Sequence, residues 1–484
     1  MVSSKELALE NAVLGKLANG FDPSERANYR RLGFKAWLND QLNPKKPENE
    51  FVRLAMANFL ASNLSLAQTA KTFPYSAKNS LVTDELVQTT VLRRLYSSRQ
   101  TFETLVEFFS DLIPVSSTVY SISRIQYDRD VIRAHALGNY PDMLLASSRA
   151  PGMLYYLNGA TNTRSHPNEN YGREILELFT VSTKFPYTQD DVVTAAKVFS
   201  GIGWSRTTMS LTVDPNKHYR GPVSLLGWSN SNPGTTPAEI LATSESMIRH
   251  LALLPATAHA FSYRLARRYV SDTPSEELVA SMAKVYLKTK GHIPSVVKTM
   301  AFSSEFAASG GAKLKRPSEY LVSTVRALGL RLSGPIQSGD PTAATYFAGS
   351  PLKSVQQQLA IQGHEPFKWP FPNGYPDVAD AWTTMTGQIQ RWNLSSTLAQ
   401  GLKGSGFSTV DYHSMLPPTA TTPEAITTAL ATRIFGAPLE PDDHKAVVAL
   451  VSKANVSQSG SDNISVWAST ATSLFFARPE WNLR

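Results

Sequence analysis

The sequence predicts a mostly α-helical, multi-helical protein with one small β-hairpin or extended flap. Apolar residues recur at the three- and four-residue spacing of an amphipathic helix, most clearly over 4–19, 26–42, 83–113 and 128–149. Short alternating runs near 207–228 are separated by turn-forming residues, and they predict the hairpin or flap. With 42% hydrophobic and 18% charged residues, the composition is that of a folded globular chain.

Loop-forming stretches divide the helical pattern into three regions. The expected boundaries are the polar segment 229–237 and the segment 331–352, which is rich in Gly, Pro, Ser and Thr. The regions are an N-terminal helical region 1–230, a central helical region 231–335 and a C-terminal helical region 353–484. Further helices are expected at 49–65, 167–181, 189–200, 277–290, 294–306, 317–329, 352–363, 379–402, 423–434, 440–456 and 466–477. The alternative is one continuous domain in which the boundary segments are loops.

Charge and cysteine content exclude several classes of function. The 484-residue chain has a net charge of +8, but its basic residues are dispersed, and the densest clusters lie at 264–268 and 313–316. Neither cluster is a run typical of a nucleic-acid arm, so no nucleic-acid partner is expected. The absence of cysteine excludes disulfides, thiolate catalysis and cysteine-ligated metals. No signal peptide is visible at the start of this chain, and no segment approaches the roughly 18 consecutive apolar residues of a membrane span.

The stretch 166–180 is the most informative part of the sequence. It places Glu169, Glu174 and Glu177 on a predicted helix with Arg173, while most of the remaining helix surface is apolar. Arg173 lies four residues from both Glu169 and Glu177, so one guanidinium can bridge two carboxylates. We expect either a general acid/base pair, because crowded and desolvated carboxyls retain protons near neutral pH, or a buried structural ion network without chemistry.

Two polar residues near this helix extend the candidate site. Asn170 lies four residues before Glu174, and Asp190 remains after Thr188 and Asp191 are assigned to the cap of the next helix. With the clustered carboxylates they suggest a second interpretation, a calcium or manganese site, because hard cations prefer oxygen ligands. The chemistry expected of the leading interpretation requires neither a metal nor another cofactor. No histidine pair has the helical spacing of a zinc site.

The segment 363–377 predicts a rigid aromatic loop. Its prolines and its Asn-Gly pair prevent regular structure, while Phe367, Trp369, Phe371 and Tyr375 provide a large aromatic surface. Planar rings of this kind can wall a ligand groove and stack on sugar faces, with Trp369, Tyr375 and Asp377 as binding residues. The alternative is a loop that folds its aromatic side chains over neighbouring helices. Any site is expected where this loop meets the 166–180 helix.

At these residues the chain resembles a large bacterial family described as domain of unknown function 1800. The matching stretches are Leu32–Leu42, Ala136–Leu145, Met153–Leu157, Pro167–Thr180, Tyr187–Val192, Gly203–Trp204, Ala266–Asp272, Lys313–Pro317, Pro372–Asp377 and Arg391–Asn393. The Asn-Glu-Asn-Tyr-x-Arg-Glu-x-x-Glu-Leu motif within Pro167–Thr180 is the most specific of them. The chain departs from the family pattern at Asn158, where Asp is common, and at His364, where Gln is usual.

The resemblance implies a mostly helical, often exported protein, frequently encoded beside a second exported protein that looks like a sulfatase or phosphatase. It implies no particular reaction. From the residues we expect an extracytoplasmic hydrolase of a polysaccharide or envelope glycan, with Glu174 as proton donor or base and Glu177 or Glu169 as its partner. Arg173 would tune the carboxyl pKa values. The alternative is a non-enzymatic envelope scaffold that binds the exported partner protein.

Overall fold

The computed structural model confirms a mostly helical protein that carries only small antiparallel sheets within its described residues. It describes residues 3–73, 79–118, 121–336, 340, 343, 346–347, 349–401, 406–454 and 462–484. Much of the predicted boundary segment 331–352 lies outside these residues, and the three-region division stays a prediction. No described helix has the length and apolar composition needed to cross a membrane.

The N-terminal helices are short and closely connected. They are α1 (Ser4–Leu17), α2 (Pro23–Leu32), α3 (Phe34–Gln41), α4 (Glu50–Ala57), α5 (Leu60–Asn63), α6 (Leu66–Thr72), α7 (Asn79–Tyr96), α8 (Gln100–Leu112), α9 (Ser121–Tyr127), α10 (Tyr140–Arg149), α11 (Pro151–Tyr156), α12 (Glu169–Glu174) and α13 (Gln189–Phe199). Asp128–Arg133 and Ile175–Phe179 are π-helical, and Gly159–Thr161 is a 3₁₀ turn.

Several predicted helices are interrupted. The one expected at 26–42 is divided into α2 and α3 at Gly33, whose φ of +76° suits a residue without a Cβ and stops the helix. The one expected at 83–113 begins at Asn79 and is divided after Tyr96 into α7 and α8. Periodicity therefore predicted the helical character of these segments but not the turns inside them.

The remaining helices follow two small hairpins. They are α14 (Pro237–Ala252), α15 (Pro255–Tyr269), α16 (Glu276–Lys288), α17 (Ile293–Ala301), α18 (Ser304–Ala308), α19 (Pro317–Leu328), α20 (Pro351–Ile361), α21 (Met385–Ala399), α22 (Tyr412–Met415), α23 (Pro423–Phe435), α24 (Pro441–Val451) and α25 (Asn463–Ala477). Ala379–Ala381 and Pro479–Asn482 are 3₁₀ turns.

Two antiparallel hairpins occupy the region where one hairpin or flap was predicted. Strands β1 (Ile202–Ser205) and β2 (Ser210–Val213) pair with Ile202 opposite Val213, and β3 (Val223–Leu225) and β4 (Trp228–Asn230) pair with Val223 opposite Asn230. Between the hairpins, the fully buried His218 forms hydrogen bonds of 2.7 Å to the Ser200 carbonyl and 2.8 Å to Asn232 Oδ1. These bonds hold the connecting segment inside the fold, so it is not a free flap.

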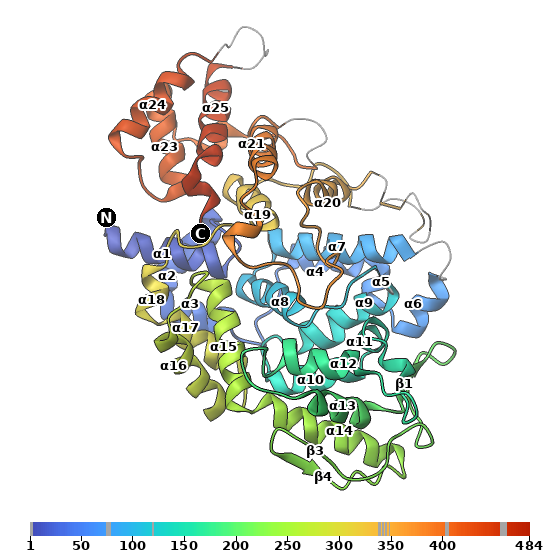
Figure 1. Cartoon of the computed structure of the whole chain (residues 1–484). Coiled ribbons are helices and arrows are strands. Elements are labelled where there is room, and N and C mark those ends of the chain that lie inside the picture. Colours follow the sequence, from blue (N-terminus) through green and yellow to red (C-terminus); the bar gives the residue numbers. More distant parts are fainter. Residues whose placement is uncertain are drawn as a thin grey trace.

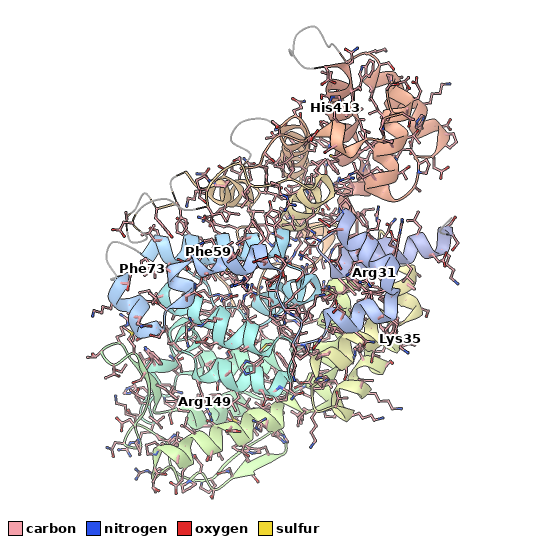
Figure 2. All side chains as sticks on the ribbon, turned by 180° about the vertical axis from the view of Figure 1, so that it is seen from behind. Arg31, Lys35, Phe59, Phe73, Arg149 and His413 are labelled. Atoms are coloured by element: carbon pink, nitrogen blue, oxygen red, sulfur yellow. The ribbon has the colours of Figure 1, made fainter. Side chains whose placement is uncertain are left out.

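Side chains distant in sequence meet in two hydrophobic cores. The first lies among α1, α3, α8, α10 and α13–α17 and is rich in aromatic residues such as Phe109, Tyr140 and Phe261. The second joins α5–α7 and α9 to α19–α25, and it includes Phe59 and Phe73, whose places among the N-terminal helices are labelled in Figure 2. Figure 1 shows the consequence: α7 lies beside α19 and α20, and the C-terminus returns to α1.

Helices α8 and α19 lie between these cores. All of α19 is buried, and so is almost all of α8. The chain's last residue closes this junction, because Arg484 N–H donates to the Lys313 carbonyl at 2.8 Å. The buried junction consequently contains charged side chains from both ends of the sequence.

Candidate functional site

The helix that carries the three glutamates changes form along its length. Asn168 caps α12, accepting a hydrogen bond from the Asn170 N–H, and after Glu174 the chain continues as the π-helical turn Ile175–Phe179. Gly172 lets α12 approach α13 closely, since a Cβ there would lie 2.8 Å from the Val192 carbonyl oxygen. Single π-helical turns occur often at functional sites, which makes this segment a reasonable place to look for one.

The predicted Glu–Arg–Glu clamp does not form, and its members are not sealed inside the fold. Arg173 pairs with Glu169 at 3.1 Å, and these side chains remain 41% and 36% exposed. Gln189 also donates to Glu169, at 2.7 Å. Glu177 instead accepts a 2.8 Å hydrogen bond from the Tyr187 hydroxyl.

Glu174 has the most distinctive environment of the three. Its side chain is half-buried, and no residue in the described part of the chain donates a hydrogen bond to it. Burial and the neighbouring Glu177 charge raise the pKa of Glu174, against a smaller opposing effect of Arg173. Burial and the Glu174 charge also raise the pKa of Tyr156.

Asn170 and Asp190 are both exposed. Asp190 lies in the first turn of α13, beside the predicted capping box, which the structure confirms: Thr188 and Asp191 satisfy each other's backbone N–H groups. Among the described residues, no three His, Asp or Glu side chains are grouped so that they could hold a metal ion. The arrangement of Asn170 and Asp190 therefore adds no support to the calcium or manganese interpretation.

The loop 363–377 packs its aromatic rings on one another. Tyr375 lies 5.1 Å from Trp369 and 4.5 Å from His364 between ring centroids, and its hydroxyl donates to the Glu365 carbonyl. Phe371 remains exposed at the edge of the loop. In Figure 1 this orange loop crosses in front of α8. The loop also contacts α11, because the Tyr156 hydroxyl donates a 2.7 Å hydrogen bond to the Pro370 carbonyl.

A cavity of about 330 Å³ lies between this loop, α8 and α15. Its lining residues are Phe108, Asp111, Leu112, Arg264, Arg267, Arg268 and the loop segment Asn373–Val378. Two of the predicted binding residues, Tyr375 and Asp377, therefore line one cavity, and Trp369 lines a smaller pocket that shares Tyr375 with it. Arg264 connects the cavity to the glutamate helix, since it donates a 2.7 Å hydrogen bond to the Leu178 carbonyl.

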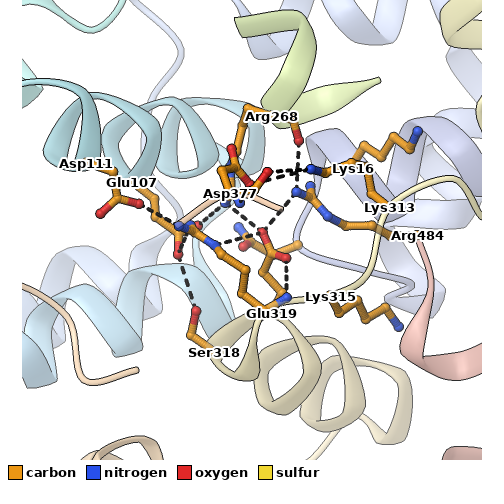
Figure 3. Close-up of polar contacts among 12 residues, drawn as sticks. Lys16, Glu107, Asp111, Arg268, Lys313, Lys315, Ser318, Glu319, Asp377 and Arg484 are labelled. Atoms are coloured by element: carbon orange, nitrogen blue, oxygen red, sulfur yellow. Dashed lines mark hydrogen bonds and ion pairs between the residues drawn. The ribbon is translucent and has the colours of Figure 1, made fainter. Parts of the chain in front are cut away.

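Behind the cavity lies a buried ion network, shown in Figure 3. Glu107 contacts Arg94 at 2.9 Å, Arg316 at 2.9 Å and Arg268 at 2.8 Å. Burial opposes ionisation of Glu107, but the three guanidiniums outweigh it and lower its pKa to about 2. Glu319 binds Arg268 at 2.6 Å and is held ionised in the same way, with its pKa well below the ordinary value.

Asp111 and Asp377 are the carboxylates of the network that face the cavity. Asp377 lies 3.4 Å from Arg268 and 3.7 Å from Lys313, and Asp111 lies 2.6 Å from Arg316. Burial raises the pKa of Asp111, with Arg316 opposing the effect. A buried ion network was one sequence-based interpretation of the glutamate helix; the structure contains such a network at the α8–α15–α19 junction instead.

Sequence reasoning missed most of this network. Arg268, Lys313 and Arg316 come from the two basic clusters at 264–268 and 313–316, which were noted only for their density, whereas Arg94 and Arg484 lie outside both clusters. Glu107 and Asp111, four residues apart on α8, resemble an ordinary solvated helix face when taken alone. The available signal was that most of these basic residues lie in the family-matching stretches Ala266–Asp272 and Lys313–Pro317.

The fold and this cavity define a class: a large α-helical protein with two cores that meet on a buried ionic junction beneath an aromatic loop. A family model described as "Protein of unknown function (DUF1800)" matches residues 12–483, and the chain belongs to that family. No curated protein and no solved structure matches the chain.

Proposed function

We propose that this protein is an extracytoplasmic hydrolase that cleaves a polysaccharide or envelope glycan by carboxylate acid/base chemistry. The observation that carries the proposal is the state of Glu174, a half-buried carboxyl whose pKa is raised by burial and by Glu177. A raised pKa keeps a carboxyl group protonated at higher pH, as a general acid requires. The π-helical turn and the adjacent aromatic loop support a site at this place.

The two carboxyls would have different roles. Glu174 would donate its proton to the departing glycosidic oxygen, while Glu177, oriented by the Tyr187 hydroxyl, would act as base or nucleophile on the other side of the bond. Residues three apart on a helix have Cβ atoms about 5–6 Å apart. That spacing is compatible with the roughly 5–9 Å between the carboxyls of glycoside hydrolases.

The structure favours Glu177 over Glu169 as the partner of Glu174. Glu177 contributes to the pKa shift of Glu174, whereas Glu169 is held by Arg173 and Gln189 on the exposed side of the helix. The remaining groups would bind substrate, with Trp369 and Tyr375 providing aromatic faces and Asp377 a hydrogen-bond acceptor. Arg173 would limit the shift, because its charge lowers the pKa of Glu174.

The test is hydrolysis of a panel of envelope and plant glycans by matched variants. We expect Glu174→Gln and Glu177→Gln to lose at least about a hundredfold in kcat/KM, the scale of general acid/base catalysis. Glu169→Gln should keep most of the activity and serves as the control on the same helix. Equal activity of Glu174→Gln and the unmodified protein on a cleaved glycan would refute the assignment.

The pH profile gives a second readout of the same pair. The activity supported by a protonated Glu174 is present at low pH and is lost as pH rises through its pKa. Because the Glu177 charge raises that pKa and the Arg173 charge lowers it, Arg173→Gln should move the loss of activity to higher pH. If Arg173→Gln and the unmodified protein lose activity at the same alkaline pH, Glu174 is not the titrating acid.

A second candidate function is a non-enzymatic envelope scaffold that binds an exported sulfatase- or phosphatase-like protein. It is favoured by the outer face of α21, where Met385, Ile389 and Trp392 follow helical spacing and remain 82%, 46% and 48% exposed. Exposed apolar stripes of this kind occur at protein interfaces. Under this function, Ile389→Glu would abolish binding to the purified exported partner, whereas Glu174→Gln would leave it unchanged.

A further inference from the structure

We infer that the cavity beneath the aromatic loop binds the anionic group of an acidic glycan, either a uronate carboxylate or a sulfate ester. The inference names a substrate class and in that respect rests on the proposed function, but its evidence lies in other residues. These are Arg264 and Arg267, two guanidiniums of α15 that line the cavity of about 330 Å³. Pockets for small ligands begin at about 300 Å³, so the space suits one charged sugar unit.

The guanidinium of Arg267 has fewer hydrogen-bond partners among the described residues than that of Arg264. Its Nε is buried without a hydrogen-bond partner among the described residues, and its guanidinium lies 5.9 Å from the centre of the Tyr263 ring. Arg264 uses one nitrogen to donate to the Leu178 carbonyl. Each arginine has five N–H donors, so most of the donors of this pair remain available to a ligand.

The two guanidiniums also lack a compensating charge. Burial lowers the pKa of Arg264, and the neighbouring Arg267 charge adds to that effect, so the pair destabilises its own ionised state. Asp377, which opposes this shift, is already held by Arg268 and Lys313. An oxyanion between Arg264 and Arg267 would relieve both the repulsion and the missing hydrogen bonds.

The other charged groups around the cavity are paired with one another. Arg268 contacts Glu107 and Glu319, and Asp111 contacts Arg316. Asp272 is bound by Lys313 and by the Ala379 N–H at 2.8 Å. Among the described residues that line the cavity, Arg264 and Arg267 are therefore the charged side chains without an ion-pair partner.

The rest of the lining favours a sugar as the carrier of the anion. Tyr375 provides an aromatic ring, and Asn373 provides an amide beside it. An aromatic face with a few polar groups is typical of a site that binds a ring bearing hydroxyls. The guanidinium fork suits planar carboxylates and tetrahedral sulfates equally, so both sources of the anion are tested below.

The experiment is titration calorimetry of the full chain with three oligosaccharides. They are a trimer of galacturonic acid, a sulfated chondroitin tetrasaccharide and neutral cellotriose. We expect at least one acidic probe to bind, the neutral probe to bind at least tenfold more weakly, and the acidic binding to weaken as salt rises. Binding of neither acidic probe, or equal binding of the neutral one, would overturn the inference.

Variants assign the binding to the cavity. Arg264→Gln and Arg267→Gln should each weaken the acidic probe about ten- to a hundredfold, as expected when a charged hydrogen bond is lost. Arg31→Gln, at an exposed arginine of α2 that does not line the cavity, should leave the affinity unchanged. Arg267→Lys keeps the charge but not the planar fork, so it should weaken the acidic probe less than Arg267→Gln does. If the glutamine variant does not fold, weaker binding of the acidic probe to Arg267→Lys than to the unmodified protein tests the inference by itself. Unchanged affinity in both Arg267 variants would overturn the inference.

Glu174→Gln separates this inference from the proposed function. It should bind the acidic probe as tightly as the unmodified protein, because Glu174 does not line the cavity. If an acidic probe binds in a way that requires Arg267 but no glycan is hydrolysed, the inference stands and the hydrolase proposal is rejected. If a neutral glycan is hydrolysed, this hydrolysis requires Glu174 and no acidic probe binds, the hydrolase proposal stands and the inference is rejected.

Discussion

Replacing Arg268 with methionine removes the cation at the centre of the network in Figure 3. The guanidinium is 2% exposed and contacts Glu107 at 2.8 Å, Glu319 at 2.6 Å and Asp377 at 3.4 Å. Removing one partner of a buried ion pair costs about 3–5 kcal/mol, because a buried charge is left uncompensated. Arg316 still contacts Glu107 and Arg484 still contacts Glu319. We therefore expect the free energy of unfolding to fall by about 3 kcal/mol, the lower end of this range.

The assay is urea unfolding followed by tryptophan fluorescence and circular dichroism together. Two probes are needed because a protein with two cores must be shown to unfold in a single transition before a free energy is assigned. Arg173→Met is the matched control: it breaks an exposed Arg–Glu pair and should change stability by about 0–1 kcal/mol. Adding Glu319→Gln to Arg268→Met should restore part of the loss, since one unpaired carboxylate disappears.

The pH dependence of this effect has a definite sign. Although burial opposes it, Arg268 makes the largest contribution to holding the pKa of Glu319 well below its ordinary value. The resulting stability is present above the unfolded-state pKa, about 4.5, and is lost as pH falls through the folded-state value. The difference in free energy of unfolding between Arg268→Met and the unmodified protein should therefore become smaller as the pH falls. If Arg268→Met is no less stable than Arg173→Met, the network does not stabilise the junction and the reasoning is refuted.

Two further substitutions test the loop above the network. Burial, and then the Arg316 charge, lower the pKa of His364 well below 6.5, so its stabilising contribution is present above pH 6.5 and is lost as pH falls. His364→Gln should therefore make the free energy of unfolding depend less on pH between pH 7 and 5; parallel curves for His364→Gln and the unmodified protein would contradict this. Gly374→Ala and Gly363→Ala each introduce a Cβ at a φ near +70°, which costs about 1–2 kcal/mol. Of these two, only the Gly374 Cβ would meet backbone, 2.0 Å from the Asp111 carbonyl oxygen. Gly374→Ala should therefore lower the free energy of unfolding more than Gly363→Ala does, and it should increase acrylamide quenching of tryptophan fluorescence. Equal effects of the two substitutions would show that the loop does not depend on this close approach.

Local spacing predicted the parts of the structure that depend on neighbours in sequence. The helical class, the hairpin region and the Thr188–Asp191 cap all follow from residues within a few positions of one another. The hydrogen bond from Tyr156 to the Pro370 carbonyl joins the aromatic loop to α11, and a site where the loop meets the glutamate helix stays a prediction. Catalytic roles for Glu174 and its partners stay a prediction, because geometry alone does not identify a reaction.

The ionic junction and the cavity were decided by the tertiary structure. Arg268 and Glu107 are separated by 161 residues, and no local pattern relates them. The same i, i+4 acidic pair on α8 would be solvated if that helix lay on the surface; here it is largely enclosed and ion-paired, because Arg268 of α15 and Arg316 at the start of α19 pack against it. Sequence periodicity reports which side of a helix is apolar, whereas the pairing of buried charges depends on which helices pack together, and that depends on the whole chain.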